Sequence, residues 1–469
     1  MHTVLSVVLV AGYVVVLTFV AVRARGAREY TDFSLARRSL PLPLIFGSLA
    51  ATYVGPGFSI GFVGRGFHSG FLFLIVGLVY SLQHILVGLL VAPRLRALND
   101  CHTLGDAIGQ KYNRTCQIFS GIISVCVCTF LAAVMAHAGK VILNDLFGLP
   151  GWLSVIIVVG ITALYTTSGG LRASVITDAF QFAAFAILLP VTLLVVLVFH
   201  MKGGPTEFVD RIVTMTERGF ASHSPLQIAG LIAAFLLGET LIPPYANRAL
   251  ASKTTGTSRN SFVLAGVFSV AWFAVMVALG VAAHGVIPEG TDEDHVLLRL
   301  VGAIMSDAGH ALLMLILVSV VMSSLDSLIN AGAVAFTQDI VKPVVELTDD
   351  TALKTGRWAT VAIAVVASTA TRVVPNIIDG LLICYTIWAA GILPVLILGL
   401  WVKQPRPLAG ILSMIVGTVV SMVAIIFLFV FPEAVGVQVI IVPALAAALL
   451  AYAFGHWVGA RGAGGTTWA

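Results

Sequence analysis

Thirteen stretches of about 20 mostly apolar residues follow one another along this chain of 469 residues, and no other feature constrains the fold as strongly. A helix of about 20 apolar residues is what the hydrocarbon core of a bilayer requires. Only 10% of the residues are charged, against about 25% in soluble domains. We therefore predict an all-α polytopic membrane protein with 13 transmembrane helices, near residues 2–24, 40–66, 70–95, 117–144, 151–169, 173–201, 225–247, 261–288, 307–334, 355–374, 378–402, 407–431 and 436–460.

The basic residues are distributed unevenly between the predicted loops. If the N-terminus lies outside, the loops that face the cytoplasm hold 19 of the 26 Lys and Arg, Arg248 among them. The positive-inside rule favours this orientation. Basic residues follow the first stretch and none precedes it, so we expect a retained span rather than a signal peptide. We predict a multi-pass protein of the plasma membrane with its N-terminus outside and its C-terminus in the cytoplasm, surrounded by the lipid bilayer, with no nucleic-acid or obligate protein partner.

Two of the predicted spans are interrupted at comparable places, five spans apart. The second contains Gly55-Pro56-Gly57, where proline cannot donate a backbone hydrogen bond and glycine favours unwinding. The seventh contains residues 238–244, which begin with Gly-Glu and end with Pro-Pro. Paired interruptions are typical of transporters built from inverted repeats, and two proline kinks with packing roles are the alternative. The predicted domains are residues 1–39 (extra N-terminal span and loop), 40–201 (first repeat), 202–224 (external loop), 225–402 (second repeat) and 403–469 (two C-terminal spans and a tail).

Hydroxyl groups line one face of the predicted ninth span. At about 100° per residue, that face contains Val320, Ser323, Ser324 and Ser327. Asp326 lies about a third of a turn away and could face a neighbouring span. Sodium binds hydroxyl, carbonyl and carboxylate oxygens, and the unwound second span would supply carbonyls near Ala50 and Tyr53. The alternative for the serines is a hydrogen bond to the carbonyl four residues earlier.

Two further acidic residues lie in apolar surroundings. Asp178 lies about 9 Å into the sixth span and is a functional candidate, the alternative being a helix-end acid wetted from the cytoplasm. Glu239 lies at the second break, where it could bind a solute, carry a proton or bond a neighbouring backbone. The residues near the two breaks are candidate solute contacts, namely Thr52, Gly55, Gly57, Phe58, Phe235, Glu239, Tyr385 and Trp388.

Three segments together carry a family resemblance. They are residues 32–41 (DFSLARRSLP) with 50–52 (AAT), residues 165–171 (YTTSGGL) with Thr177-Asp178 and Gln181, and residues 323–327 (SSLDS) with 336–340 (FTQDI). Through them the chain resembles the sodium:solute symporter family over nearly all of its length. The resemblance implies a LeuT-like core of ten helices in two inverted five-helix halves, with one extra N-terminal helix and two extra C-terminal helices.

The resemblance also implies where sodium would bind. The usual first sodium site of the family would fall on the carbonyls of Ala50, Tyr53 and Val320 and the hydroxyls of Ser323 and Ser324. Some members resemble a two-sodium arrangement, and the second site would here use Asp178, Ser323, Asp326 and Ser327. Asp326 stands where several members have serine or another small residue.

These features together predict a secondary active transporter rather than an enzyme. The expected function is the sodium-coupled symport of a small organic solute, an amino acid or a carboxylate, by alternating access, with Na⁺ as the bound ion. A proton-coupled carrier and a sodium-coupled transporter of a quaternary amine such as choline are the alternatives. We find no nucleophile–base pair in the sequence, and the five cysteines lack the spacing of a metal site.

Overall fold

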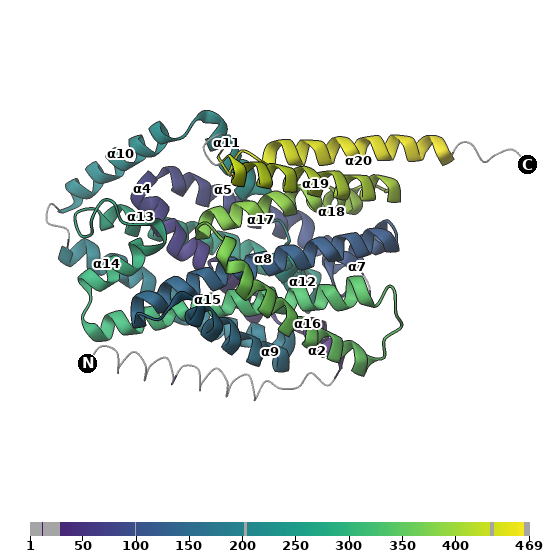
Figure 1. Cartoon of the computed structure of the whole chain (residues 1–469), viewed down its shortest axis with the longest axis horizontal. Coiled ribbons are helices and arrows are strands. Elements are labelled where there is room, and N and C mark those ends of the chain that lie inside the picture. Colours follow the sequence, from purple (N-terminus) through teal and green to yellow (C-terminus); the bar gives the residue numbers. More distant parts are fainter. Residues whose placement is uncertain (1–11, 13–28, 99, 201–203, 432–435, 464–469) are drawn as a thin grey trace, which may run out of the picture.

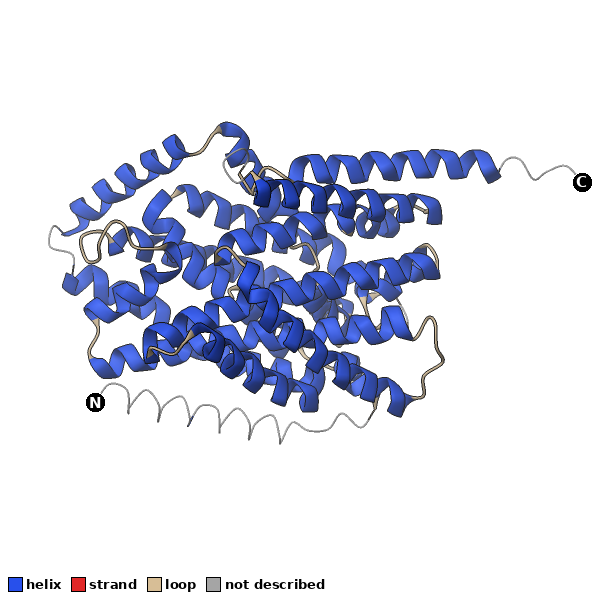
Figure 2. Ribbon diagram, viewed as in Figure 1, coloured by secondary structure: helices blue, strands red, loops and turns tan. Residues whose placement is uncertain are grey.

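The computed structural model is a bundle of packed helices (Figures 1 and 2). It describes residue 12 and residues 29–98, 100–200, 204–431 and 436–463. Within these ranges the backbone forms no strand and only two isolated bridges, so the all-helical prediction is confirmed. Apart from residue 12, the predicted first span lies outside the described residues.

The described helices are α2 (Tyr30–Leu35), α3 (Leu42–Tyr53), α4 (Phe62–Ser69), α5 (Leu72–Leu86), α6 (Ala92–Arg96), α7 (Leu104–Lys111), α8 (Arg114–Phe147), α9 (Gly151–Val195), α10 (Gly204–Ser222), α11 (Pro225–Leu237), α12 (Pro243–Ala251), α13 (Thr255–Ala283), α14 (Val296–Ile304), α15 (Asp307–Ala335), α16 (Asp349–Ala370), α17 (Ile377–Gly391), α18 (Leu393–Trp401), α19 (Pro407–Val430) and α20 (Ile441–Ala463). By length and hydropathy, the described part of the chain has eight helices that can cross a membrane, or up to ten when each of two bent pairs counts as one span. The protein is therefore multi-pass, and the number 13 stays a prediction.

The break in the predicted second span separates α3 from α4. Helix α3 ends at Tyr53, and a π-helical turn, η2 (Gly57–Gly61), leads into α4 at an angle of 57° to α3. The break forms because Pro56 has no N–H to donate to the carbonyl of Thr52, four residues earlier. A β-carbon at position 57 would overlap Leu381 Cδ1, so a larger residue there would need the end of that side chain to move.

The break in the predicted seventh span separates α11 from α12. Residues 238–242 form a turn in which Leu241 has a φ of 49°, in the left-handed region. A β-carbon on Gly238 would collide with the side chain of Tyr385, so the turn packs closely against α17. Pro243 and Pro244 then begin α12, at positions where a missing N–H costs the helix nothing.

The segment 202–224, expected as an external loop, contains helix α10. Its Arg211 pairs with Glu207 one turn earlier, and Gly219 lies against the backbone of Ser69 at the end of α4. Helix α10 meets α11 at an angle of 102°. The segment therefore covers the end of α4 rather than forming an irregular connection.

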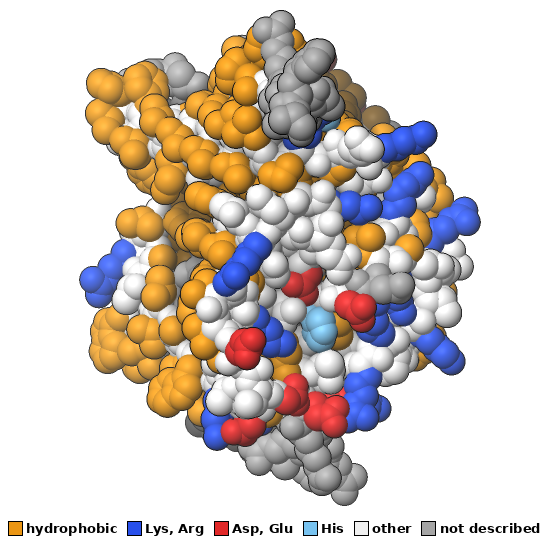
Figure 3. Space-filling view, turned by 90° about the vertical axis from the view of Figure 1, so that its right-hand side faces the viewer, with side chains coloured by type: hydrophobic (Ala, Val, Ile, Leu, Met, Phe, Trp, Pro, Cys, Tyr) orange, Lys and Arg blue, Asp and Glu red, His pale blue; other side chains and the backbone are white. Residues whose placement is uncertain are grey.

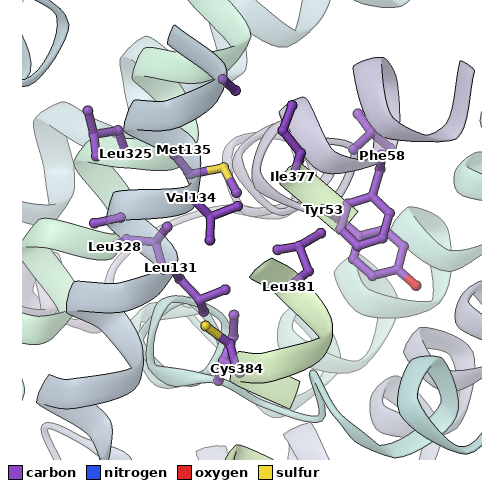
Figure 4. Close-up of a cluster of buried hydrophobic side chains, with 14 of the residues drawn as sticks. Tyr53, Phe58, Leu131, Val134, Met135, Leu325, Leu328, Ile377, Leu381 and Cys384 are labelled. Atoms are coloured by element: carbon purple, nitrogen blue, oxygen red, sulfur yellow. The ribbon is translucent and has the colours of Figure 1, made fainter. Parts of the chain in front are cut away.

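Helix α15 lies at the centre of the bundle, whereas α19 lies at its surface. The apolar stretch of the span that contains α15 is 89% buried, against 22% for that of α19. Apolar side chains of α8, α15 and α17 gather beside Tyr53 and Phe58 in the core (Figure 4). At the end of the molecule that carries α7, charged side chains gather on the surface, and apolar side chains cover the adjoining flank (Figure 3). An apolar flank with a charged end is what a bilayer requires.

Candidate functional site

The first break packs against the serine face of α15. A β-carbon built on Gly55 would lie 2.5 Å from Ser324 Oγ and 3.1 Å from Thr52 O, so hydroxyl and carbonyl oxygens face the same small space. Ser324 Oγ is buried and has no hydrogen-bond partner in the described part of the chain. A buried hydroxyl without a partner is costly, and such an atom is accounted for when it binds an ion or water.

The groups around Ser324 suit a hard cation. Ser323 donates its proton to Asp178 Oδ1 at 2.5 Å, which leaves the lone pairs of its oxygen for another ligand. Pro56 leaves the carbonyl of Thr52 without its helical donor. Hydroxyl and carbonyl oxygens are the ligands of sodium. The predicted first-site residues are all buried here, and the full set stays a prediction: Ala50, Tyr53, Val320, Ser323 and Ser324.

The residues of the predicted second sodium site meet around a cation that the chain itself supplies. Arg248 Nη2 lies 2.8 Å from Asp178 Oδ2, and both side chains are 0% exposed. The prediction that Arg248 lies in a cytoplasmic loop is wrong, because it lies on α12 in the second half of the broken span. Asp178 is likewise not a helix-end acid wetted by solvent.

The guanidinium of Arg248 is hydrogen-bonded on several sides. Its Nε donates to Ser48 Oγ at 2.7 Å, its Nη1 to Pro244 O at 2.9 Å, and its second Nη2 contact is Ser327 Oγ at 2.5 Å. Ser48 in turn donates to Asp178 Oδ2 at 2.6 Å. A buried charge persists only when it is paired and its donors are satisfied. This network joins α3, α9, α12 and α15.

Asp326 belongs to the same network from the side of α9. Its Oδ1 accepts hydrogen bonds from Ser174 at 2.9 Å and Ser327 at 3.1 Å, and its Oδ2 has no partner among the described residues. The serines of α15 thus bond acidic groups across the bundle. The alternative of a bond to the carbonyl four residues earlier does not apply to Ser323 or Ser327.

The candidate solute residues near the second break form a connected aromatic cluster. Glu239 accepts hydrogen bonds from Tyr245 at 3.0 Å and from Tyr385 at 2.8 Å. Trp388 Nε1 donates to the carbonyl of Thr240 at 2.8 Å. Ring contacts link the two breaks, since Phe235 packs on Phe58 (6.2 Å between ring centroids) and on Tyr385 (5.7 Å). Thr52 lies apart from this cluster and bonds Ser48 O, one turn earlier.

Replacing Tyr385 with Phe removes one hydroxyl donor from the buried Glu239. We expect the variant to lose about 1–3 kcal/mol of stability, because a buried polar group left without its partner costs about that much. Thermal unfolding of the purified protein in detergent measures the loss. Tyr452→Phe is the matched control, since its partner Tyr112 keeps a hydrogen bond to Val395 O and the cost should be smaller. Equal effects in the two variants would contradict this role of the Tyr385 hydroxyl.

Four residues of the site were missed by the sequence reasoning: Ser48, Ser174, Tyr245 and Arg248. Arg248 carried a usable signal, because it follows the second break by only a few residues and precedes three more apolar positions. The two serines carried none, since small hydroxyl residues are common in membrane helices. Tyr245 bonds Glu239 across the turn between α11 and α12, and only the tertiary path of that turn places the two together.

A second group of charges lies on α4, on the connection after α13 and at the start of α17. Arg65 Nε lies 3.0 Å from Glu293 and its Nη2 lies 3.0 Å from Asp379. A polar cavity of about 440 Å³ lies in the same region, lined in part by His137, Lys140, Asn144, Asp292, Asp294 and His295. Lys140 Nζ lies 3.3 Å from His137 Nδ1, and both side chains line this cavity.

A further polar cluster fixes α7 against α8 and the end of α15. Asp106 accepts hydrogen bonds from Gln117 at 2.6 Å and Gln338 at 2.9 Å, and from the backbone N–H of His102 at 2.8 Å. Burial raises the pKa of Asp106 to about 6. Burial, with the nearby charges of Lys342 and Arg38, lowers the pKa of His102 to about 4.

Replacing His102 with Gln should flatten the dependence of stability on pH below neutrality. The pKa of His102 in the folded protein is about 4, below the ordinary value of 6.5, so between these pH values the unfolded chain binds a proton that the folded chain does not bind. The stability that comes from a neutral His102 is therefore complete above about pH 6.5 and is lost as the pH falls towards 4. Unfolding temperatures at several pH values in this window test it, and identical slopes for both proteins would contradict it.

A multi-pass helical bundle with two broken helices and buried oxygen atoms between them is typical of secondary transporters. A model of the sodium:solute symporter family matches residues 33–417. The chain belongs to this family, whose members are transporters and not enzymes, so both predictions are confirmed.

Individual relatives are distant. The chain is 25% identical over 357 residues to the uncharacterized symporter YidK of Escherichia coli (71% of this chain, 61% of YidK). It is 24% identical to sodium/glucose cotransporter 2 of Rattus norvegicus (66% and 53%) and 23% identical to the human sodium/myo-inositol cotransporter (70% and 52%). The matches thus cover about half to three fifths of the length of these relatives.

Two solved structures show the same fold. A Na⁺-coupled sialic acid symporter in a substrate-bound outward-open state superposes with a TM-score of 0.83 at 14% identity, covering 97% of this chain and 98% of that one. Mhp1, a nucleobase-cation-symport-1 family transporter, gives a TM-score of 0.56 at 12% identity, with 92% and 95% covered.

Proposed function

We propose that this protein couples the entry of sodium to the uptake of a small organic solute by alternating access. The observation that carries the proposal is the buried, unpartnered hydroxyl of Ser324, which faces Gly55 and the carbonyl of Thr52 at the first break. Several relatives are named as sodium cotransporters, and the sialic acid symporter is named as Na⁺-coupled, which supports the same ion.

We propose an amino acid or another small carboxylate as the solute. The polar cavity offers Lys140 and His137 from α8 and Asp292 and Asp294 from the connection before α14, which are complementary to the two charges of a zwitterion. Among the solutes named for the similar proteins, sialic acid carries a carboxylate, whereas glucose and myo-inositol are neutral. Neutral polyols are therefore the rival class in an uptake screen.

The two arginine groups suit a role as gates on either side of the candidate solute residues. Arg65 ties α4 to the start of α17 and to Glu293, and Arg248 ties α12 to α9. Glu239 and Tyr385 lie buried in the core, with exposed fractions of 5% and 0%. In the proposed cycle, opening to one side separates Arg65 from its acids, and opening to the other separates Arg248 from Asp178.

Uptake by proteoliposomes tests the coupling. Radioactive amino acids, glucose and myo-inositol are offered at fixed pH with sodium outside, or with potassium in its place. We expect uptake of an amino acid to fall at least tenfold without sodium, because the membrane potential alone supplies about 2.3 kcal/mol per charge per 100 mV through the coupled ion. Undiminished uptake in potassium would contradict sodium coupling. Uptake of glucose or myo-inositol only would contradict the solute class.

A quaternary amine is the second candidate solute. Three aromatic rings of the cluster, those of Phe58, Phe235 and Tyr385, lie in contact, and Glu239 adds an acidic group beside them. Aromatic rings attract quaternary ammonium groups by cation–π interaction. Competition by choline in the same assay decides between the two, since choline should leave the uptake of an amino acid unchanged if a carboxylate is required.

A further inference from the structure

Arg248 places a permanent positive charge inside the predicted second sodium site. Resting on the proposed sodium coupling, we infer that its guanidinium is the resident cation of that site and that the chain binds one sodium ion, between Gly55 and Ser324. Arginine stays protonated in proteins, so the charge is present in every state of the transport cycle.

The residues around Arg248 leave few free oxygen lone pairs for a second sodium ion. Asp178 Oδ2 accepts from Arg248 and Ser48, and its Oδ1 accepts from Ser323. Ser327 Oγ accepts from Arg248 and donates its single proton to an acid, at 3.1 Å from Asp326 or 3.4 Å from Asp178. Asp178 Oδ2 and Ser327 Oγ already accept hydrogen bonds from the guanidinium, and a sodium ion needs several free oxygen lone pairs together.

Asp326 Oδ2 belongs to the predicted second set and has no hydrogen-bond partner in the described part of the chain. A single carboxylate oxygen is a poor sodium site, because hard cations take about six oxygen ligands. A sodium ion bound there would also meet the like charge of Arg248, which shares Ser327 with Asp326. The residues present therefore do not fit a second sodium ion in this structure.

The guanidinium also performs the structural role that an ion in this site would have. Arg248 lies just after the second break and Ser48 lies on α3, just before the first. Through Asp178 on α9 and Ser327 on α15, the same side chain joins both broken spans to the centre of the bundle. The connection is covalently attached to α12, so this cation does not leave with the solute.

Binding of radioactive sodium to the purified protein tests the inference without a solute. We expect saturation at one ion per chain, and Ser324→Ala should need about ten times more sodium for half-saturation. Two ions per chain in the unmodified protein, or an unchanged sodium affinity in Ser324→Ala, would overturn the inference while leaving sodium coupling intact. The absence of any sodium binding would instead contradict the proposed function.

A substitution of Arg248 gives the complementary result. Removing the guanidinium leaves Asp178 and Asp326 with free oxygens, so Arg248→Ala should bind a second sodium ion. Arg248→Lys keeps the charge and should remain at one ion. A folded, monodisperse Arg248→Ala protein that still binds one ion would overturn the assignment of Arg248 as the substitute for sodium. If Arg248→Ala does not fold, the unmodified protein and Ser324→Ala still decide the number of ions.

Discussion

Asp178→Ala is expected to destabilise the protein by about 3–5 kcal/mol, the cost of removing one partner of a buried ion pair. The variant leaves the guanidinium of Arg248 in the core without its counter-charge, and arginine cannot escape by losing its proton. The yield of monodisperse protein and its unfolding temperature in detergent measure the effect.

The controls separate burial from charge pairing. Asp379→Ala breaks the ion pair with Arg65, but these side chains are 29% and 16% exposed, so water replaces the lost contact and the cost should fall nearer to 0–1 kcal/mol. In the double variant Asp178→Leu with Arg248→Met, both charges are removed, and part of the stability should return. If Asp178→Ala and Asp379→Ala unfold alike, Arg248 is not confined as the structure describes it.

Ser324→Ala is expected to raise the sodium concentration required for half-maximal stabilisation by about tenfold or more, which corresponds to about 1.4 kcal/mol of binding free energy. The substitution removes a buried hydroxyl at the first break that has no hydrogen-bond partner among the described residues. Unfolding temperatures in sodium chloride, compared with potassium chloride at equal ionic strength, measure the sodium requirement.

Two further variants make the result specific. Gly55→Ala should have the same effect from the opposite side, because its methyl group would lie 2.5 Å from Ser324 Oγ. Thr162→Ala is the matched control, since it removes a buried hydroxyl that bonds Val158 O at 2.8 Å within α9. Unchanged sodium dependence in both Ser324→Ala and Gly55→Ala would remove the first site. A shift in Thr162→Ala of the same size would show that it reflects general destabilisation.

Patterns within short stretches of the sequence were sufficient to predict the class of fold and the positions of the two helix breaks. The apolar stretches predicted a multi-pass helical protein because lipid admits no unpaired backbone, and Gly55-Pro56-Gly57 predicted an interruption because proline removes a donor. The positions of Ser323 and Ser324 followed from helical periodicity alone. Each of these inferences depends on residues within a few turns of one another.

Contacts between residues far apart in the chain could not be predicted from the sequence, and Arg248 shows why. An arginine near the end of an apolar stretch is more often in a loop, because burying its charge costs several kcal/mol unless a partner is present. That partner, Asp178, lies 70 residues away in the chain, and Ser48 lies 200 residues away. The energy that keeps Arg248 in the core is therefore absent from its local sequence.

The sequence by itself determined that this protein crosses the membrane many times, that two of its helices break, and that serine hydroxyls share one face of a helix. Those properties arise from hydropathy, from the missing N–H of proline and from a period of 3.6 residues. Only the tertiary structure decided which cation Asp178 meets, because a buried acid accepts whichever donors the packing of α3, α12 and α15 brings to it. The packing brings the chain's own guanidinium to that acid, and it leaves the hydroxyl of Ser324 open beside Gly55.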